Sequence, residues 1–220
     1  MAILDDLRAS VLATRIIASV DQSLAKQLKL KADQVSIGLI TSDCDDVTYV
    51  ALDEATKAAN VQVVFASSFY AGAAHASGPL SGEVIGIIAG PGPADVISGI
   101  NRCKEVIEHE AAFKSANADG SLAYFAHVVS ATGTYLSAEA KVEPGEALAY
   151  LIAPPLEAMF AMDAALKSAD VRMAGFFPPP SETNYAGGYL TGSQAACRAA
   201  CDAFEAAVLA VATQPIDSGV

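Results

Sequence analysis

The side chains most capable of catalysis are few in this sequence and stand far apart. The three histidines are expected in a loop (His75), near a helix end (His109) and at the start of an apolar strand (His127). None belongs to a His-Glu-x-x-His or cysteine–histidine metal spacing. No serine stands in a Gly-x-Ser-x-Gly elbow. The pattern therefore does not indicate an enzyme.

The densest group of ionisable side chains is the run Ser42-Asp43-Cys44-Asp45-Asp46. Its carboxylates could hold a hard cation, but their spacing is not that of a calcium loop, so we predict no metal. The turn Gly90-Pro91-Gly92-Pro93 opens a helix, yet its prolines remove N–H donors that a phosphate cradle requires. We therefore predict no cofactor.

Composition narrows the class of protein further. The chain has 220 residues and a net charge of −12, and 53% of its residues are hydrophobic. The acidic balance argues against a nucleic-acid partner, which needs a basic surface. No uninterrupted apolar run is long enough for a membrane span, and charges in the first twenty residues argue against a signal peptide. The high apolar content suggests that part of the surface is buried in contacts with other copies of the chain.

The four cysteines, Cys44, Cys103, Cys197 and Cys201, form no Cys-x-x-Cys pair. We interpret them as small packing residues in a reducing cytoplasm.

An internal repeat is the strongest signal of organisation. Asp53-x-Ala55-x-Lys57-x-Ala59-x-Val61 returns as Asp163-x-Ala165-x-Lys167-x-Ala169-x-Val171, an offset of 110 (163 − 53). Upstream, Ser36–Ile40 aligns with Leu148–Ile152. A duplicated unit predicts two pseudo-symmetric domains, which we place at residues 1–115 and 116–220.

Each half predicts the element order strand, strand, helix, strand, strand, helix, hence an α+β fold with helices on one face of an antiparallel or mixed sheet. Asp45 and Asp46 suit the first turn of a helix, and Asp53 and Lys57 are expected to pair at i,i+4 on its exposed side. The predicted elements are strands 16–20, 35–40, 61–65 and 83–89 with helices 45–60 and 94–110, then strands 127–131, 147–152, 171–177 and one near Tyr189 with helices 156–170 and 193–212.

Several segments resemble bacterial microcompartment shell proteins. Asp53–Val61 resembles the signature helix-to-strand segment of shell domains, and a strand ahead of the usual first one is similar to circularly permuted members. Five further stretches resemble the tandem-domain shell proteins of ethanolamine-utilisation compartments: Asp45–Tyr49, Tyr70–His75, Ala153–Glu157, Ala164–Val171 and Pro178–Tyr185. The resemblance covers nearly the whole chain and implies two tandem, circularly permuted ferredoxin-like α/β sandwich domains.

The resemblance also implies partners. It implies a homotrimer that mimics a hexamer, neighbouring shell proteins in a hexagonal layer, and a place in the shell of a cytoplasmic compartment. Lys57 and Lys167 would lie at the edge between tiles, where long cations can cover a neighbour's carbonyl groups. The alternative is a solvated lysine paired with Asp53 or Asp163. Similar proteins are associated with a corrinoid, for which this sequence contains no motif.

Two kinds of pore follow from the same resemblance. Loops 66–82 and 178–188 would form a gated central pore, or they are ordinary surface loops; the pore candidates are Gly72, His75, Gly78, Pro180, Glu182, Asn184 and Tyr185. A smaller acidic pore in each subunit would hold small polar molecules such as ethanolamine. Its candidates are Asp45, Asp46, Glu83, Phe113, Tyr70 and Thr183.

The sequence is also consistent with an ordinary structural role for these three carboxylates. Asp45 and Asp46 would serve equally as helix N-terminal acids, and Glu83 as a solvated charge at a strand end. A soluble small-amine sensor, or an enzyme of ethanolamine metabolism, is the alternative to a structural shell protein.

Overall fold

The computed structural model describes residues 3–69, 83–179, 181 and 184–216. These residues form two compact units. The first unit contains residues 8–111 and 133–136; the second contains the described residues of 1–7, 112–132 and 137–220. The division between shell domains at 115 and 116 stays a prediction.

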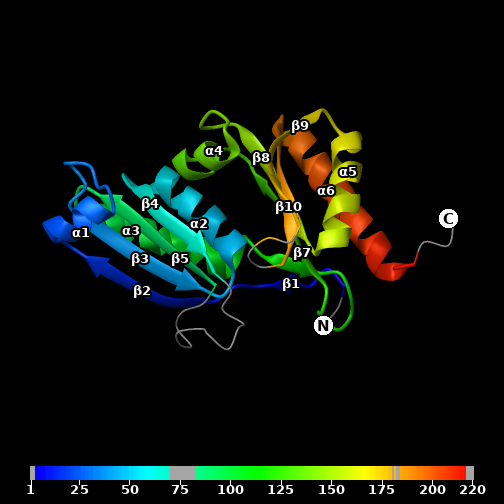
Figure 1. The fold of residues 1–220 in the computed structure, drawn as a ribbon, viewed down its shortest axis with the longest axis horizontal. Helices are drawn as coiled ribbons and strands as arrows, with labels where there is room; N and C mark the ends of the chain where they lie inside the picture. Colours follow the sequence, from blue (N-terminus) through cyan, green and yellow to red (C-terminus); the bar gives the residue numbers. More distant parts are fainter. Residues whose placement is uncertain (1–2, 70–82, 180, 182–183, 217–220) are drawn as a thin grey trace. The chain divides into compact units, whose positions relative to one another are not determined.

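The first unit is a four-stranded antiparallel sheet in the order β2-β3-β5-β4, with helices α2 and α3 against one face (Figure 1). Glycines allow these helices to approach closely: a Cβ on Gly38 would lie 2.6 Å from Ile100 of α3, and one on Gly86 would lie 2.8 Å from Leu52 of α2. The elements are β2 (Val11–Ile17), α1 (Gln22–Gln27), β3 (Ser36–Ser42), α2 (Asp45–Ala58), β4 (Gln62–Ser68), β5 (Val84–Gly90), α3 (Pro93–Glu105) and a π-helical turn, η1 (Val106–Glu110).

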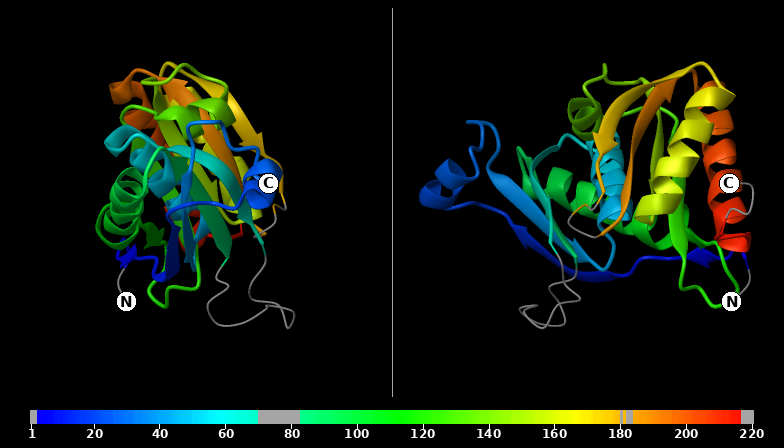
Figure 2. Two further views of the ribbon diagram at one scale, coloured as in Figure 1. Left: turned by 90° about the vertical axis from the view of Figure 1, so that its left-hand side faces the viewer. Right: turned by 45° about the vertical axis from the view of Figure 1, so that its right-hand side comes forward.

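The second unit is a six-stranded antiparallel sheet in the order β1-β6-β7-β8-β10-β9. Helices α5 and α6 pack together over one face (Figure 2). Alternate residues of β8, including Ala149 and Leu151, join Phe204 of α6 in the core. The elements are β1 (Asp6–Leu7), β6 (Phe113–Ser115), β7 (Ala123–Val129), β8 (Ala147–Ala153), α5 (Pro155–Ser168), β9 (Val171–Phe177), β10 (Ala186–Gly192) and α6 (Gln194–Thr213). Helix α4 (Thr134–Ala140) is divided between the units, because residues 134–136 belong to the first unit and the rest of the helix belongs to the second.

The internal repeat is reproduced strand by strand. The order β2-β3-β5-β4 of the first unit recurs as β7-β8-β10-β9 in the second. Both edge strands bulge at the same place, since Val64 of β4 and Ala174 of β9 are each skipped in the pairing. Helices α2 and α5 also end alike, at Ala59 and Ala169 in extended conformation. The predicted α+β class with two tandem units is confirmed.

Some predicted boundaries are wrong. The strands predicted at 16–20 and 127–131 are β2 and β7, which lie earlier at Val11–Ile17 and Ala123–Val129 because pairing with β3 and β8 sets their limits. The loops predicted at 66–82 and 178–188 are shorter, because β4 continues to Ser68 and β10 begins at Ala186. Four short elements, β1, β6, α1 and α4, were not predicted.

Candidate functional site

The acidic candidates gather where β3 ends and α2 begins. Asp45 and Asp46 occupy the first turn of α2 and are 8% and 7% exposed. The backbone N–H of Asp46 donates to the Asp45 carboxylate at 2.9 Å. Helix α2 has no side-chain cap at Cys44, so these two acids are the charges nearest its positive end.

Glu83 comes to the same place from the other end of the 70–82 segment. Its N–H donates to the Ser42 carbonyl at 2.8 Å, and its own carbonyl accepts from the N–H of Phe69 at 2.8 Å. Burial raises the pKa of the Glu83 carboxyl, and the charges of Asp45 and Asp43 raise it further. The structure therefore brings Asp45, Asp46 and Glu83 together as one electronegative group.

Asp43 belongs to this acidic group, although sequence reasoning did not select it. Its carboxylate accepts from the N–H of Ser10 at 2.6 Å, which fixes its position beside β2. Its place within the run Ser42–Asp46 was the available signal. The pKa of nearby Tyr49 is raised to about 12, mainly by burial and further by the charges of Asp45 and Asp46.

The aromatic candidate Phe113 lies on β6 of the second unit. Its ring stacks on Phe125, with centroids 5.1 Å apart, and meets the edge of Tyr185 at 5.9 Å. Phe113 was a candidate for the small acidic pore and Tyr185 for the central-pore loop, so two residues predicted for different pores contact each other. Phe125 was missed because nothing distinguishes it from an ordinary strand residue.

The described part of the pore-loop candidates is small. Asn184 has a left-handed backbone (φ 65°), and its N–H donates to the Ser181 carbonyl at 3.0 Å. Outside the described residues lie the ligand candidates Tyr70 and Thr183 and the pore candidates Gly72, His75, Gly78, Pro180 and Glu182.

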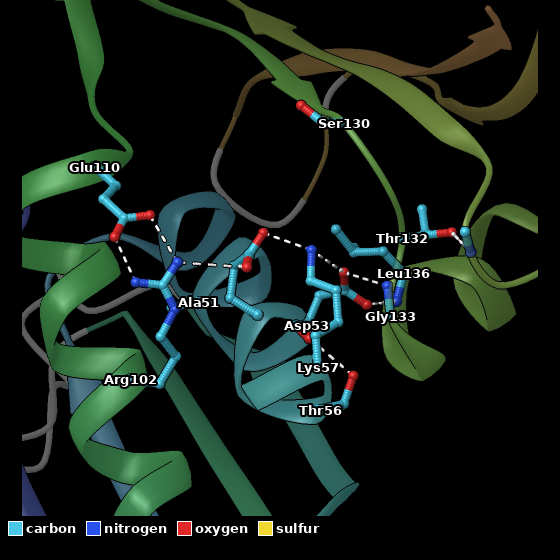
Figure 3. A network of polar contacts seen from close by, with 12 residues as sticks. Ala51, Asp53, Thr56, Lys57, Arg102, Glu110, Ser130, Thr132, Gly133 and Leu136 are labelled. Atoms are coloured by element: carbon cyan, nitrogen blue, oxygen red, sulfur yellow. Dashed lines mark hydrogen bonds and ion pairs between the residues drawn. The ribbon is translucent and has the colours of Figure 1, made fainter. Parts of the chain in front are cut away.

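Asp53 behaves differently from its prediction. It is not the exposed partner of a surface lysine but a fully buried carboxylate. One oxygen accepts from the N–H of Gly133 at 2.7 Å and the other from the N–H of Leu136 at 2.8 Å (Figure 3). Thr56 accepts from the N–H of Thr134 at 3.0 Å. Helix α2 thus supplies acceptors to N–H groups at the start of α4 that have no partner within that helix.

The two edge-lysine candidates differ in their surroundings. The Lys57 ammonium lies 2.5 Å from a Glu54 carboxylate oxygen and 3.7 Å from Asp53, and Glu54 also pairs with Arg102 of α3 (Figure 3). The Lys167 ammonium contacts Asp163 at 2.5 Å, and its side chain is 74% exposed. Both lysines therefore have acidic partners on their own helix, and an edge role stays a prediction.

Other features complete the chemical inventory. All four cysteines are free thiols, three of them buried, and burial raises the pKa of Cys103 to about 12. Among the described residues there is no cluster of three or more His, Cys, Asp or Glu side chains placed to hold a metal. Nor does any described helix combine the length and hydrophobicity of a membrane span.

Comparison with known proteins identifies the family. The family model described as the BMC domain matches residues 36–118. The bacterial microcompartment shell protein EutL of Clostridium perfringens is 60% identical over 212 residues, which cover 96% of this chain and 98% of that protein. The chain belongs to the EutL family of bacterial microcompartment shell proteins. Its role is that of a structural shell protein rather than an enzyme.

Two further comparisons agree with membership of the EutL family. The EutL shell protein of Salmonella typhimurium is 55% identical and covers 98% of this chain and 99% of its own length. The crystal structure of ethanolamine utilization protein EutL from Leptotrichia buccalis has a TM-score of 0.95 at 60% identity, covering 99% of this chain and all of that one. The likeness extends over both units.

Proposed function

We propose that this shell protein forms trimers in which the six units of three chains make one pseudohexameric tile, and that tiles join edge to edge into a layer. The observation that carries the proposal is the recurrence of one four-strand order, one bulge and one helix end in both units. Near-equivalent units favour closed rotational assembly. Lys57 and Lys167, equivalent positions on α2 and α5, would lie at the tile edges.

Electron microscopy of the purified protein tests the tile directly. Hexagonally packed two-dimensional arrays at high protein concentration are the expected result. A protein that stays monomeric and forms no arrays under the same conditions would contradict the proposal.

The central pore would be formed by residues 69–83 and 178–185, the connections between β4 and β5 and between β9 and β10. Their described ends support this, because each connection leaves and re-enters neighbouring antiparallel strands at the same end of the sheet. Connections at equivalent places in six units would meet around one axis. We propose that these loops gate passage of small molecules.

The acidic group at the start of α2 would bind a small ammonium compound such as ethanolamine. Burial and the charges of Asp45 and Asp43 raise the pKa of the Glu83 carboxyl. Asp46, Asp45 and Glu83 all lie close enough to Cys44 for their charges to add to burial in raising the pKa of its thiol. A bound ammonium would offset that repulsion and donate charge-assisted hydrogen bonds to the carboxylates. Phe113, Tyr70 and Thr183 stay proposed neighbours of the ligand.

Calorimetry with ethanolamine tests this binding. Wild type is expected to release heat and Glu83→Gln to bind at least about tenfold more weakly, because one charged acceptor is lost. Glu157→Gln, an acid in the first turn of α5, is the matched control and should bind normally. Wild-type affinity should rise as pH rises through the raised pKa of Glu83, since the ionised form binds the cation. Equal heats from wild type, Glu83→Gln and Asp45→Ala would remove the site.

A further inference from the structure

A polar cavity of about 350 Å³ lies in the second unit, at the end of the sheet where β8 and β9 begin and β10 ends. The connection between β9 and β10, proposed above for the central pore, leaves these strands at their opposite end. The cavity also shares no residue with the acidic group at the start of α2. Its polar lining comes from Glu146, Asp170, Arg172, Thr191 and Ser193.

Charged groups of both signs line this cavity. The guanidinium of Arg172 lies 3.8 Å from a carboxylate oxygen of Glu146, and the two side chains are 61% and 41% exposed. The Glu146 carboxylate is held in place, because one of its oxygens accepts from the N–H of Glu143 at 3.2 Å and the other lies 3.3 Å from the Thr191 hydroxyl. The Arg172 pair is too long for a close hydrogen bond, so the guanidinium can still donate to a bound anion.

The start of helix α6 adds partial positive charge to the cavity. Ser193 is the N-cap, and its hydroxyl accepts from the N–H of Ala196 at 3.1 Å. The first turn of α6 contains no acid, whereas the first turn of its repeat equivalent α3 contains Asp95. The positive end of α6 is therefore not offset by an acid of its own first turn.

The same turn precedes β3 in the first unit and β8 in the second, at an offset of 112 residues (143 − 31). The N–H of Gln34 donates to the Lys31 carbonyl at 3.0 Å, and that of Glu146 donates to the Glu143 carbonyl at 3.1 Å. In both turns the side chain of the last residue accepts from the N–H of the first, at 2.8 Å and 3.2 Å. Lys31 and Gln34 are therefore the equivalents of Glu143 and Glu146.

In the first unit, an ammonium group of the chain itself occupies the equivalent place. Lys31 donates from its ammonium to the side-chain oxygen of Gln62 at 2.8 Å, and the Gln34 amide donates to the same oxygen at 3.1 Å. Gln62 is the equivalent of Arg172 (172 − 62 = 110). The second unit replaces the lysine by the exposed Glu143 and the glutamine of the turn by a carboxylate. It has thus exchanged a built-in ammonium for acidic side chains.

We propose that this cavity binds a small zwitterion that carries one ammonium group and one carboxylate, as an amino acid does. The ammonium would lie against Glu146 and Asp170, where the Lys31 ammonium lies in the first unit. The carboxylate would accept hydrogen bonds from Arg172 and from N–H groups at the start of α6. A simple amine would leave the guanidinium without an anion, and a simple anion would face two carboxylates, so a ligand with both charges is favoured.

Titration of the whole protein with glycine tests the site, followed by the amide chemical shifts of residues 146, 172 and 192. Glycine should bind, and methylamine and acetate, which carry its two charges separately, should bind at least about tenfold more weakly. Arg172→Gln and Glu146→Gln should each weaken glycine binding about tenfold, because each removes one charged partner. Glu83→Gln, in the acidic group at the start of α2, should leave glycine binding unchanged.

A second variant uses the repeat itself. Glu143→Lys copies the first unit, so its ammonium should occupy the place of the ligand and weaken glycine binding about tenfold. Glu139→Lys makes the same change of charge at an exposed position of α4 and is the matched control, which should bind glycine like wild type.

The outcomes that overturn the inference are distinct. Acetate or methylamine binding as tightly as glycine would make the cavity a site for one charge only. Unchanged shifts with glycine would remove the site, and normal glycine binding by Arg172→Gln or Glu143→Lys would contradict the assigned contacts. Both of these side chains are exposed, so the two variants decide the matter even if Glu146→Gln fails to fold by circular dichroism. None of these results bears on the proposed trimer.

Discussion

Helices α2 and α5 carry the same aspartate–lysine pair in equivalent places and use the aspartate differently. In α2, Asp53 is buried and accepts two backbone N–H groups of residues 133–136. In α5, Asp163 is solvent-exposed and pairs only with Lys167 among the contacts described. A motif therefore fixes the helix and its position, whereas the segment that packs against the helix decides what the carboxylate does.

The largest expected difference between the two helices is the loss of stability when each aspartate is replaced by alanine. Asp53→Ala leaves two buried N–H donors without an acceptor and should lower the free energy of unfolding by about 2–4 kcal/mol. Asp163→Ala removes an exposed ion pair and should change it by no more than about 0.5 kcal/mol. Denaturant titration at one protein concentration measures both, since assembly also stabilises the fold. Equal losses from the two variants would contradict the contrast between the helices.

Crowding at Gly133 gives the next largest effect. A Cβ there would lie 2.3 Å from the Thr56 hydroxyl oxygen and 2.7 Å from the Asp53 carbonyl oxygen. Gly133→Ala should therefore cost about 1–3 kcal/mol in thermal or chemical unfolding. In the control Gly92→Ala, the new Cβ meets only Asp95 at 3.7 Å, and the cost should stay below about 1 kcal/mol. A neutral Gly133→Ala would mean that residues 133–136 do not lie so close to α2.

Reversing the charge of Lys57 or Lys167, the proposed edge lysines, should affect assembly more than folding. Lys167→Asp and Lys57→Asp should leave the trimer intact and impair array formation, because like charges would face the acidic surface of a neighbouring tile. Lys167→Asp should change the free energy of unfolding by no more than about 0.5 kcal/mol. Lys57→Asp should lower it more, because the new carboxylate would replace a cation that lies 3.7 Å from buried Asp53. Electron microscopy of arrays, with the exposed Lys141→Asp as control, measures the effect. Dissociation of the trimer would show that these lysines lie elsewhere.

The smallest expected effect is a change with pH in the stability that Asp53 contributes. Burial raises the pKa of Asp53, although the N–H groups of Gly133 and Leu136 oppose that shift. A raised pKa means that the folded state holds the proton to higher pH than the unfolded state does. The stability of wild type relative to Asp53→Asn should therefore fall as pH rises from the ordinary aspartate pKa through the folded value. A relative stability that rises over this interval would contradict the assignment.

Local sequence patterns predicted most of the fold. Runs such as Val61–Phe65 and Val171–Phe177 contain several β-branched and aromatic residues. The first lies in β4 from Gln62 onward, and the second is the whole of β9. The repeat correctly predicted two similar units. Helix α1, with six residues and no buried side chain, lacks the apolar periodicity that would have revealed it. Strands β1 and β6, of two and three residues, are too short to show alternation.

The candidate site was predicted less completely, because its contacts join residues distant in sequence. The acids Asp45 and Asp46 were visible as neighbours, and their position in the first turn of α2 followed from helix chemistry. Asp53 is buried beside Gly133 and Leu136, which are 80 and 83 positions further along the chain. Its i,i+4 spacing to Lys57 could not reveal these partners and predicted an exposed pair instead. The contact between Phe113 and Phe125 depends likewise on the pairing of β6 with β7.

In the proposed assembly, two copies of one module in each chain build a ring from three chains. The molar mass of the wild-type protein in solution, measured by light scattering, tests it most directly. The expected molar mass is three times the chain mass of 22.5 kDa. A single species with the mass of one chain, unchanged as the protein is concentrated, would contradict it.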